Sequence, residues 1–341
     1  ILSIGMAVDA NVIIFARIKE EICAGKSIRV SVQAGFKNAL STVLDAQITT
    51  LIAAVVLYEV GTTSVKGFAL TLMIGIIISI FTAVIIRQLF ISLLAESKKF
   101  SKNKYFGVNE DGTPKQFLHK TFSFIRHRKV FYIISAGIII IGFAVTFVRG
   151  MNYGIDFTGG TMIQVDLHEQ VAISEVEEAV KEYDLNPSII YSGEGNEQVV
   201  IKTIEALDTD QRAEVVKTLE ENFGITDEDV LASEQFGPSV GDELKLNAVK
   251  AVAIASVGML IYIIFRFKSW KYGLSAIAGV VHDVLLVIAF YGIFGFTVNN
   301  PFIAAILTLV GYSINDTIVI FDRIRENTGL YRKAGLEANI D

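Results

Sequence analysis

Two aspartates of this sequence lie inside strongly apolar stretches, where an ionised carboxylate is energetically costly. Asp9 lies eight residues before Arg17, and Asp316 lies seven residues before Arg323. On α-helices these spacings correspond to about 12 Å and about 10 Å of rise, so both carboxylates are expected near the middle of a bilayer core about 30 Å thick. A carboxylate at that depth must be paired, hydrated or protonated. Burial raises the pKa of a carboxyl group and an opposing cation lowers it, so alternation between these two environments would let it load and release a proton.

The same carboxylates belong to an internal repeat without gaps. Residues 5–20 align with residues 311–326, with six of sixteen positions identical and several others exchanging only Val for Ile or Lys for Arg. Asn11 and Asn315 accompany the carboxylates in the two copies. Both copies run toward the same membrane face, which indicates two halves related by an axis along the membrane normal. The alternative is a polar clamp, in which these side chains only hold two helices together.

Three other ionisable residues are candidates for a proton relay. His282 and Asp283 are adjacent, so on a helix their side chains point about 100° apart and need not touch, and ordinary packing is the alternative. Asp45 is expected near the start of a helix, where a cap or an interface position is the alternative. Arg17 and Arg323 are interpreted as anchors at the membrane interface.

The composition excludes several other classes of protein. Hydrophobic residues form 52% of the 341-residue chain and charged residues only 19%, against about 25% in soluble domains. The single cysteine, Cys23, excludes a disulfide framework and a metal site built from cysteines. The sequence also lacks a Ser/His/Asp triad, zinc spacing, a dinucleotide glycine pattern and a basic-aromatic stripe. It therefore predicts a membrane protein with no catalytic residue, no metal and no nucleic-acid partner.

Seven stretches satisfy or approach the length of about 20 apolar residues that a spanning helix needs. They are residues 1–16, 42–60, 67–93, 130–148, 247–265, 271–296 and 301–321. The first is expected to be cut at its start, in a piece of a longer protein. Residues 95–129 hold nine Lys and Arg against three acids, whereas residues 151–246 hold 22 acids against five Lys and Arg. The positive-inside rule then predicts seven helices and one acidic external domain.

The external segment has the pattern of a small α+β domain. Its expected elements are a strand at Thr161–Leu167, a helix at 174–183 with Ser174 as its N-cap, strands at 188–192 and 197–203 around a turn, a helix at 208–223 and a strand at 229–236. This β-α-β-β-α-β order is the ferredoxin-like plan. We interpret its acidity as a solvated surface.

Four motifs resemble a known family. Residues 5–12, followed by 15–21, look like the fourth-helix motif of SecD, while residues 311–323 resemble the fourth helix of SecF and His282-Asp283 fits its third. Gly154, Asp156, Phe157, Gly159 and Gly160 lie in a motif similar to the entry to the SecF periplasmic domain. The chain therefore resembles the SecD/SecF family of bacterial protein-export proteins, in the fused arrangement.

This resemblance implies an α-helical polytopic membrane protein with transporter helices of the RND type, a pseudo-two-fold repeat and one α+β ferredoxin-like external domain. The implied parts are SecD-like helices at 1–94, a basic cytoplasmic linker at 95–129, a first SecF-like helix at 130–149, the external domain at 150–246, SecF-like helices at 247–326 and a cytoplasmic segment at 327–341. Gly159 and Gly160 are expected to supply tight turns.

The resemblance also implies a role as an accessory subunit of the bacterial Sec translocase in the plasma membrane, with residues 150–246 extracytoplasmic. It implies use of the proton motive force, with sodium as the alternative ion and no bound cofactor, for late translocation and release of exported unfolded polypeptides. The implied partners are the SecYEG channel, YidC, YajC-type subunits and the lipid bilayer.

In the family the proton path uses carboxylates matching Asp9 and Asp316, together with an arginine of the next SecF helix, which has no counterpart in this sequence. The isolated chain is therefore not expected to transport. Two alternatives remain open. One is an RND efflux pump for small molecules or lipids, although the roughly 95-residue external segment is short for such a pump. The other is a scaffold whose polar pairs only specify packing.

Overall fold

The computed structural model describes residues 2–61, 63–97, 102–115 and 123–330. The chain forms two compact units, of which the first contains Ile1–Ile141, Ala251–Ala289 and Ala304–Asp341. The second unit contains Gly142–Lys250 and Phe290–Ile303. The predicted linker at 95–129 lies only partly within the described residues, and most of the predicted cytoplasmic segment at 327–341 lies outside them.

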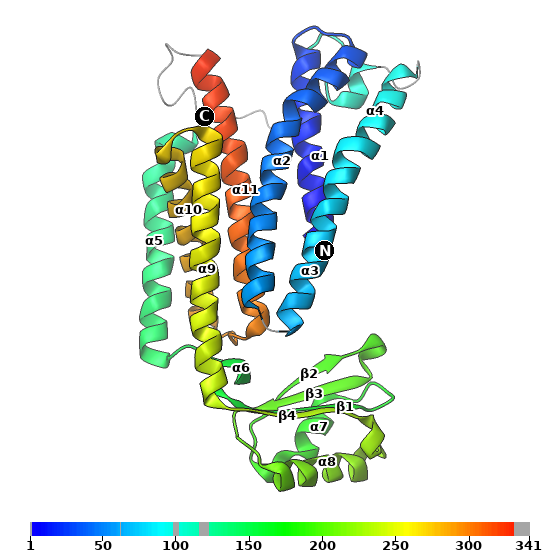
Figure 1. Cartoon of the computed structure of the whole chain (residues 1–341), viewed down its shortest axis with the longest axis vertical. Helices are drawn as coiled ribbons and strands as arrows, with labels where there is room; N and C mark the ends of the chain where they lie inside the picture. Colours follow the sequence, from blue (N-terminus) through cyan, green and yellow to red (C-terminus); the bar gives the residue numbers. More distant parts are fainter. Residues whose placement is uncertain (1, 62, 98–101, 116–122, 331–341) are drawn as a thin grey trace. The chain divides into compact units, whose positions relative to one another are not determined.

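Long helices dominate the first unit (Figure 1). Those that lie wholly or partly in it are α1 (Leu2–Cys23), α2 (Ile28–Val60), α3 (Thr63–Phe81), α4 (Arg87–Glu96), α5 (Phe124–Arg149), α9 (Pro238–Phe267), α10 (Trp270–Phe294) and α11 (Asn300–Leu330). A short π-helical segment, Thr82–Ile86, joins α3 to α4 without a break in the helix, since the residues on either side of it are also helical.

Six helical stretches in the described part of the chain are long and apolar enough to cross a membrane. They are Ile28–Val60, Val65–Glu96, Phe124–Arg149, Gly241–Phe267, Trp270–Phe294 and Asn300–Thr328. Each overlaps one of the spans predicted from the sequence, although Trp270–Phe294 ends two residues before the predicted span 271–296 and Ile28–Val60 begins well before residue 42. The remaining predicted span, at residues 1–16, falls on α1, which is not one of the six, so it stays a prediction.

The second helix is longer than predicted, because α2 begins at Ile28 and not at residue 42. Its early turns carry polar side chains, but Phe36 is buried in one apolar cluster with Ile18 of α1. Gly35 allows the two helices to approach closely, since a Cβ there would lie 2.5 Å from Cγ1 of Ile18. Burial of this amphipathic face against α1 therefore adds about four turns to the helix.

The second unit contains the predicted ferredoxin-like domain. Its elements are α6 (Ile155–Thr158), β1 (Gly160–Asp166), α7 (Ile173–Ala179), β2 (Ser188–Ser192), β3 (Gln198–Thr203), α8 (Thr209–Phe223) and β4 (Val230–Phe236). The four strands are antiparallel in the order β2-β3-β1-β4, with α7 and α8 on one face of the sheet (Figure 1). Val165 and Ile201 of the sheet share a buried core with Leu219 of α8. The predicted β-α-β-β-α-β order is therefore confirmed.

The ends of the domain helices follow the sequence signals unequally. Ser174 is not the N-cap of α7, because the helix starts one residue earlier and Ala172, which precedes it, has an extended backbone. The helix also ends early and is followed by the 3-10 turn Lys181–Tyr183. In contrast, Asp208 caps α8 by accepting a 2.9 Å hydrogen bond from the backbone N–H of Gln211, whose side chain accepts one from the Asp208 N–H.

Candidate functional site

Three aspartates from three helices of the first unit lie close enough to interact electrostatically. Asp9 lies on α1, Asp283 on α10 and Asp316 on α11, and Asp316 is within electrostatic range of both Asp9 and Asp283. Asp9 and Asp283 are half-buried, whereas Asp316 is exposed. We call these three residues the carboxylate cluster. The structure thus brings together the two repeat carboxylates and one of the predicted relay residues.

Asp283 connects two of the helices through hydrogen bonds. The hydroxyl of Ser313 on α11 donates a 2.6 Å bond to Oδ2 of Asp283, and Nδ1 of His282 lies 2.9 Å from Oδ1. His282 and Asp283 are adjacent on α10, and although such neighbours need not touch, their side chains are in contact here. Sequence reasoning missed Ser313, although it lies one turn before Asp316 and therefore on the same face of α11.

The two asparagines of the repeat differ in their surroundings. Asn11 is half-buried on α1, whereas Asn315 is 6% exposed on α11. Within the described residues, the buried Oδ1 of Asn315 accepts no hydrogen bond. An unpaired buried acceptor costs about 1–3 kcal/mol, so this amide does not provide the satisfied contact that a polar clamp requires.

In the part of the chain that the structure describes, the carboxylate cluster has no Lys or Arg partner, and its basic neighbour is His282, 2.9 Å from Asp283. The ion pairs found there do not include a Lys or Arg bonded to Asp9 or Asp316. The described residues also contain no group of three His, Cys, Asp or Glu side chains able to hold a metal ion. The cluster therefore consists of like charges, and binding of a proton would relieve the repulsion between them.

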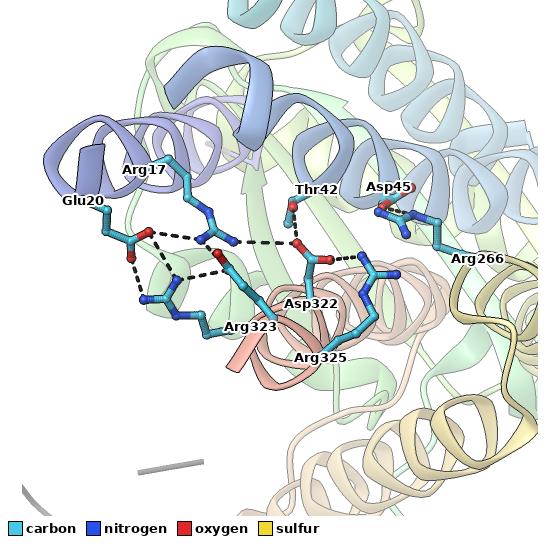
Figure 2. A network of polar contacts seen from close by, with 9 residues as sticks. Arg17, Glu20, Thr42, Asp45, Arg266, Asp322, Arg323 and Arg325 are labelled. Atoms are coloured by element: carbon cyan, nitrogen blue, oxygen red, sulfur yellow. Dashed lines mark hydrogen bonds and ion pairs between the residues drawn. The ribbon is translucent and has the colours of Figure 1, made fainter. Parts of the chain in front are cut away.

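Asp45 has the opposite kind of environment. It lies in the middle of α2 and is 6% exposed, so the prediction that it lies near a helix start is wrong. Tyr262 Oη donates a 2.7 Å hydrogen bond to Oδ1, and Arg266 Nε donates a 2.5 Å bond to Oδ2 (Figure 2). Both partners come from α9, which extends beyond the predicted span 247–265 and so includes Arg266. Asp45 is thus held in a buried ion pair, and its role in a proton relay stays a prediction.

The glycine-rich motif at the root of the second unit is structural. Asp156 Oδ2 accepts a 2.9 Å hydrogen bond from the backbone N–H of Asn300, so it caps the first turn of α11. Phe157 is 3% exposed. Gly160 has φ of 142°, and a Cβ there would lie 2.2 Å from the carbonyl oxygen of Thr203. No larger residue fits at position 160 without a shift of the sheet.

The neighbouring glycines of this motif also shape the backbone. Gly159, which ends α6, has φ of 81°, and the N–H of Gly154 donates a 2.8 Å hydrogen bond to the carbonyl oxygen of Val298. These contacts fit the expectation that the motif supplies tight turns at the domain root.

Comparisons with known proteins agree on one family. The sequence model described as "Protein export membrane protein SecD/SecF, C-terminal" matches residues 1–97 and 215–341, and the model described as "SecD/SecF GG Motif" matches residues 144–171. The second match contains the glycine-rich motif.

Individual relatives point the same way. The protein translocase subunit SecDF of Bacillus subtilis is 39% identical over 96% of this chain and 45% of its own length. The protein translocase subunit SecF of Sebaldella termitidis is 39% identical over 61% of this chain and 67% of its own length. A crystal structure of SecDF from Thermus thermophilus, described as a translocon-associated membrane protein, superposes with a TM-score of 0.80 at 34% identity, covering 99% of this chain and 45% of that one. The chain thus spans less than half the length of these SecDF relatives.

Proposed function

This chain belongs to the SecD/SecF family of protein-export membrane proteins, and we propose that it forms part of an accessory subunit of the bacterial Sec translocase that couples a proton gradient to protein export. It is a multi-pass membrane protein, mostly helical, with a small antiparallel sheet. Its relatives are named as protein translocase subunits, which supports a transport role without covalent chemistry.

The carboxylate cluster is the observation that supports proton coupling. Like charges on Asp9, Asp283 and Asp316 repel one another, and this repulsion is strong where water is scarce. A proton bound by Asp316 removes its charge and relieves the repulsion. Each proton that crosses the membrane supplies about 2.3 kcal/mol for every 100 mV of potential, which lies within the range of about 1–3 kcal/mol typical of coupling between two sites.

The hydrogen bonds around Asp283 provide the route from protonation to movement. Ser313 donates to the carboxylate of Asp283 on another helix, and it lies one turn from Asp316 on its own helix. A change of charge at Asp316 therefore alters the balance of forces at the contact between α10 and α11. In this account His282 completes the relay by holding the other oxygen of Asp283, and sodium is the alternative coupling ion.

The remaining parts of the role follow from the family and the charge pattern. We place the protein in the plasma membrane, with residues 150–246 outside the cytoplasm, because the segment 95–129, with nine Lys and Arg, belongs on the cytoplasmic side of the helix that separates the two. The proposed partners are the SecYEG channel and exported unfolded polypeptides, with YidC and YajC-type subunits as further members of the assembly. Because the chain covers only part of its SecDF relatives, the test uses the full-length parent protein.

The test is the completion of export in vesicles that contain the SecYEG channel and the full-length parent protein. We expect Asp9→Asn and Asp316→Asn to slow release of the exported polypeptide about as much as an ionophore that collapses the proton gradient. The control is Asp210→Asn, which changes an exposed carboxylate in the first turn of α8. If both cluster variants assemble and still respond to the ionophore like the wild type, the carboxylates are structural and the proposal is wrong.

A further inference from the structure

The internal repeat ends in four charged residues that the proposed proton path does not use. Arg17 and Glu20 of the first copy occupy the same repeat positions as Arg323 and Glu326 of the second. These residues lie at the carboxyl ends of α1 and α11, and Figure 2 shows Arg17 and Glu20 facing Arg323.

The two copies exchange reciprocal ion pairs. Arg17 Nη1 lies 2.6 Å from Oε2 of Glu326, and Arg323 Nη2 lies 2.7 Å from Oε1 of Glu20. Within each helix the Arg and Glu are also paired, at 3.1 Å in both copies. The four side chains therefore form a closed ring of alternating charge, and each contact in one copy has its equivalent in the other. We call this ring the repeat clasp.

A second close approach of the same helices joins the start of α1 to the middle of α11. A Cβ added to Gly5 on α1 would lie 3.7 Å from the hydroxyl oxygen of Tyr312 on α11. The two helices are thus adjacent at two levels, and Asp9 and Asp316 lie between these levels in sequence. Asp9 precedes Glu20 by eleven residues and Asp316 precedes Glu326 by ten, so the difference in their distance from the clasp is about 1.5 Å.

We propose that the repeat clasp positions Asp9 and Asp316 by holding α1 and α11 in one axial register. A displacement of one helix by a single turn would move its carboxylate by about 5.4 Å and remove it from its place in the carboxylate cluster. The register itself follows from the clasp contacts, whereas its consequence for transport rests on the proposed function.

The ring differs from an ordinary surface ion pair in its connectivity. An isolated exposed pair contributes little, because solvent screens it and ordering the side chains costs entropy. Here every residue meets two opposite charges, and the side chain of Arg17 is only 16% exposed. Asp322 lies 3.8 Å from Arg17 and accepts a 2.9 Å hydrogen bond from Thr42, which links the clasp to α2.

Charge inversion can separate the contacts between the helices from those within each helix. The variant Arg323→Glu with Glu326→Arg keeps the pair within α11 and keeps the net charge, but it places like charges opposite Glu20 and Arg17. Inverting Arg17 and Glu20 as well restores alternating charge around the whole ring. The matched control is Lys217→Glu with Glu221→Lys, which inverts an exposed pair within α8.

The direct readout is cross-linking by a short bifunctional thiol reagent between cysteines introduced by Gly5→Cys and Tyr312→Cys in a Cys23→Ala full-length protein, since the tyrosine ring spans the gap between these positions and two cysteine side chains are too short to do so. We expect the α11 inversion to slow this cross-linking about fivefold or more, and the four-residue inversion to return it to within about twofold of the original rate. Unchanged cross-linking in the α11 inversion, or no recovery in the four-residue inversion, would overturn the proposal.

If the α11 inversion fails to assemble, a milder variant is Glu20→Gln with Arg323→Gln. It removes one of the two ion pairs between the helices and is also expected to slow cross-linking. Proton entry during export is measured on the same variants and should fall and recover with the cross-linking. Recovery of cross-linking without recovery of proton entry would show that the register is not what supports transport. The two proposals can also fail separately. If the clasp variants change cross-linking as expected but the Asp9 and Asp316 variants transport normally, the proposed function is rejected and the clasp is retained.

Discussion

Asp45 and Asp316 are both aspartates on long helices of the first unit, yet they have opposite surroundings. Asp45 is 6% exposed, and a guanidinium and a phenol satisfy its two oxygens. Asp316 is exposed and interacts electrostatically with two other carboxylates, Asp9 and Asp283. No Lys or Arg among the described residues pairs with it. Burial therefore does not mark the residue that is able to change its charge. The distinguishing feature is whether a cation already balances the carboxylate.

The largest expected effect on stability comes from removing the cation of the balanced site. Arg266→Gln leaves the buried carboxylate of Asp45 without its partner, and breaking a buried pair in this way costs about 3 kcal/mol or more of unfolding free energy. We expect a lower unfolding midpoint for the detergent-solubilised protein. Lys271→Gln, which removes an exposed cation at the start of α10, should leave the midpoint unchanged.

A double variant sharpens this prediction. Asp45→Asn combined with Arg266→Gln removes both charges, so the protein should recover part of the stability lost in the single variant. If Arg266→Gln unfolds like the wild type, or if the double variant is no more stable than the single one, charge balance does not explain the Asp45 site.

A smaller effect on stability, with a larger one on transport, is expected at the carboxylate cluster. Ser313→Ala removes the donor to Asp283 and should lower the unfolding free energy by about 1 kcal/mol. Because the same bond joins α10 to α11, we expect proton-dependent export to slow about fivefold. The control is Thr308→Ala on the same helix, whose hydroxyl bonds only to the backbone of Ala304. Equal export rates in the two variants would remove Ser313 from the relay.

The smallest expected effect concerns Asp229, a carboxylate outside the membrane-spanning helices that is stabilised by hydrogen bonds. The pKa of Asp229 is lowered by hydrogen bonds from the backbone N–H and the hydroxyl of Thr226, and by His168. Since the folded-state pKa is below the unfolded value of about 3.9, this stabilisation is present above that pH and is lost as the pH falls through the folded value. The wild type should be more stable than Asp229→Asn at pH 7, and the difference should shrink below about pH 4. A difference that does not depend on pH would contradict this account.

Much of the architecture could be predicted because its signals are local. Ionisable residues inside apolar runs identified Asp9, Asp283 and Asp316, and alternating apolar residues identified the strands of the second unit. The repeat was equally visible, and its shared Arg and Glu positions contained the signal for the clasp. We interpreted Arg17 and Arg323 only as interface anchors, because a sequence does not show that two equivalent helices face each other.

Two of the failures came from contacts between distant segments. Asp45 and Arg266 are separated by 221 positions, so no local pattern joins them. The start of α2 was missed because its first turns look polar until Phe36 is seen to pack with α1. Ser174 is a good N-cap residue by type, but the backbone becomes helical one residue before it. At Asp45 and at the start of α2, contacts between distant segments decided the outcome, whereas the shift at Ser174 is local.

The central claim is that the unbalanced carboxylate cluster carries protons during export. The most direct measurement is proton movement across vesicles in which the protein has a known orientation. A pH-sensitive dye follows it while the full-length parent and the SecYEG channel export a polypeptide. We predict that Asp316→Asn reduces export-dependent proton entry about fivefold or more, while its unfolding free energy stays within about 0.5 kcal/mol of the wild type. Proton entry at the wild-type rate in a correctly assembled Asp316→Asn protein would contradict the account.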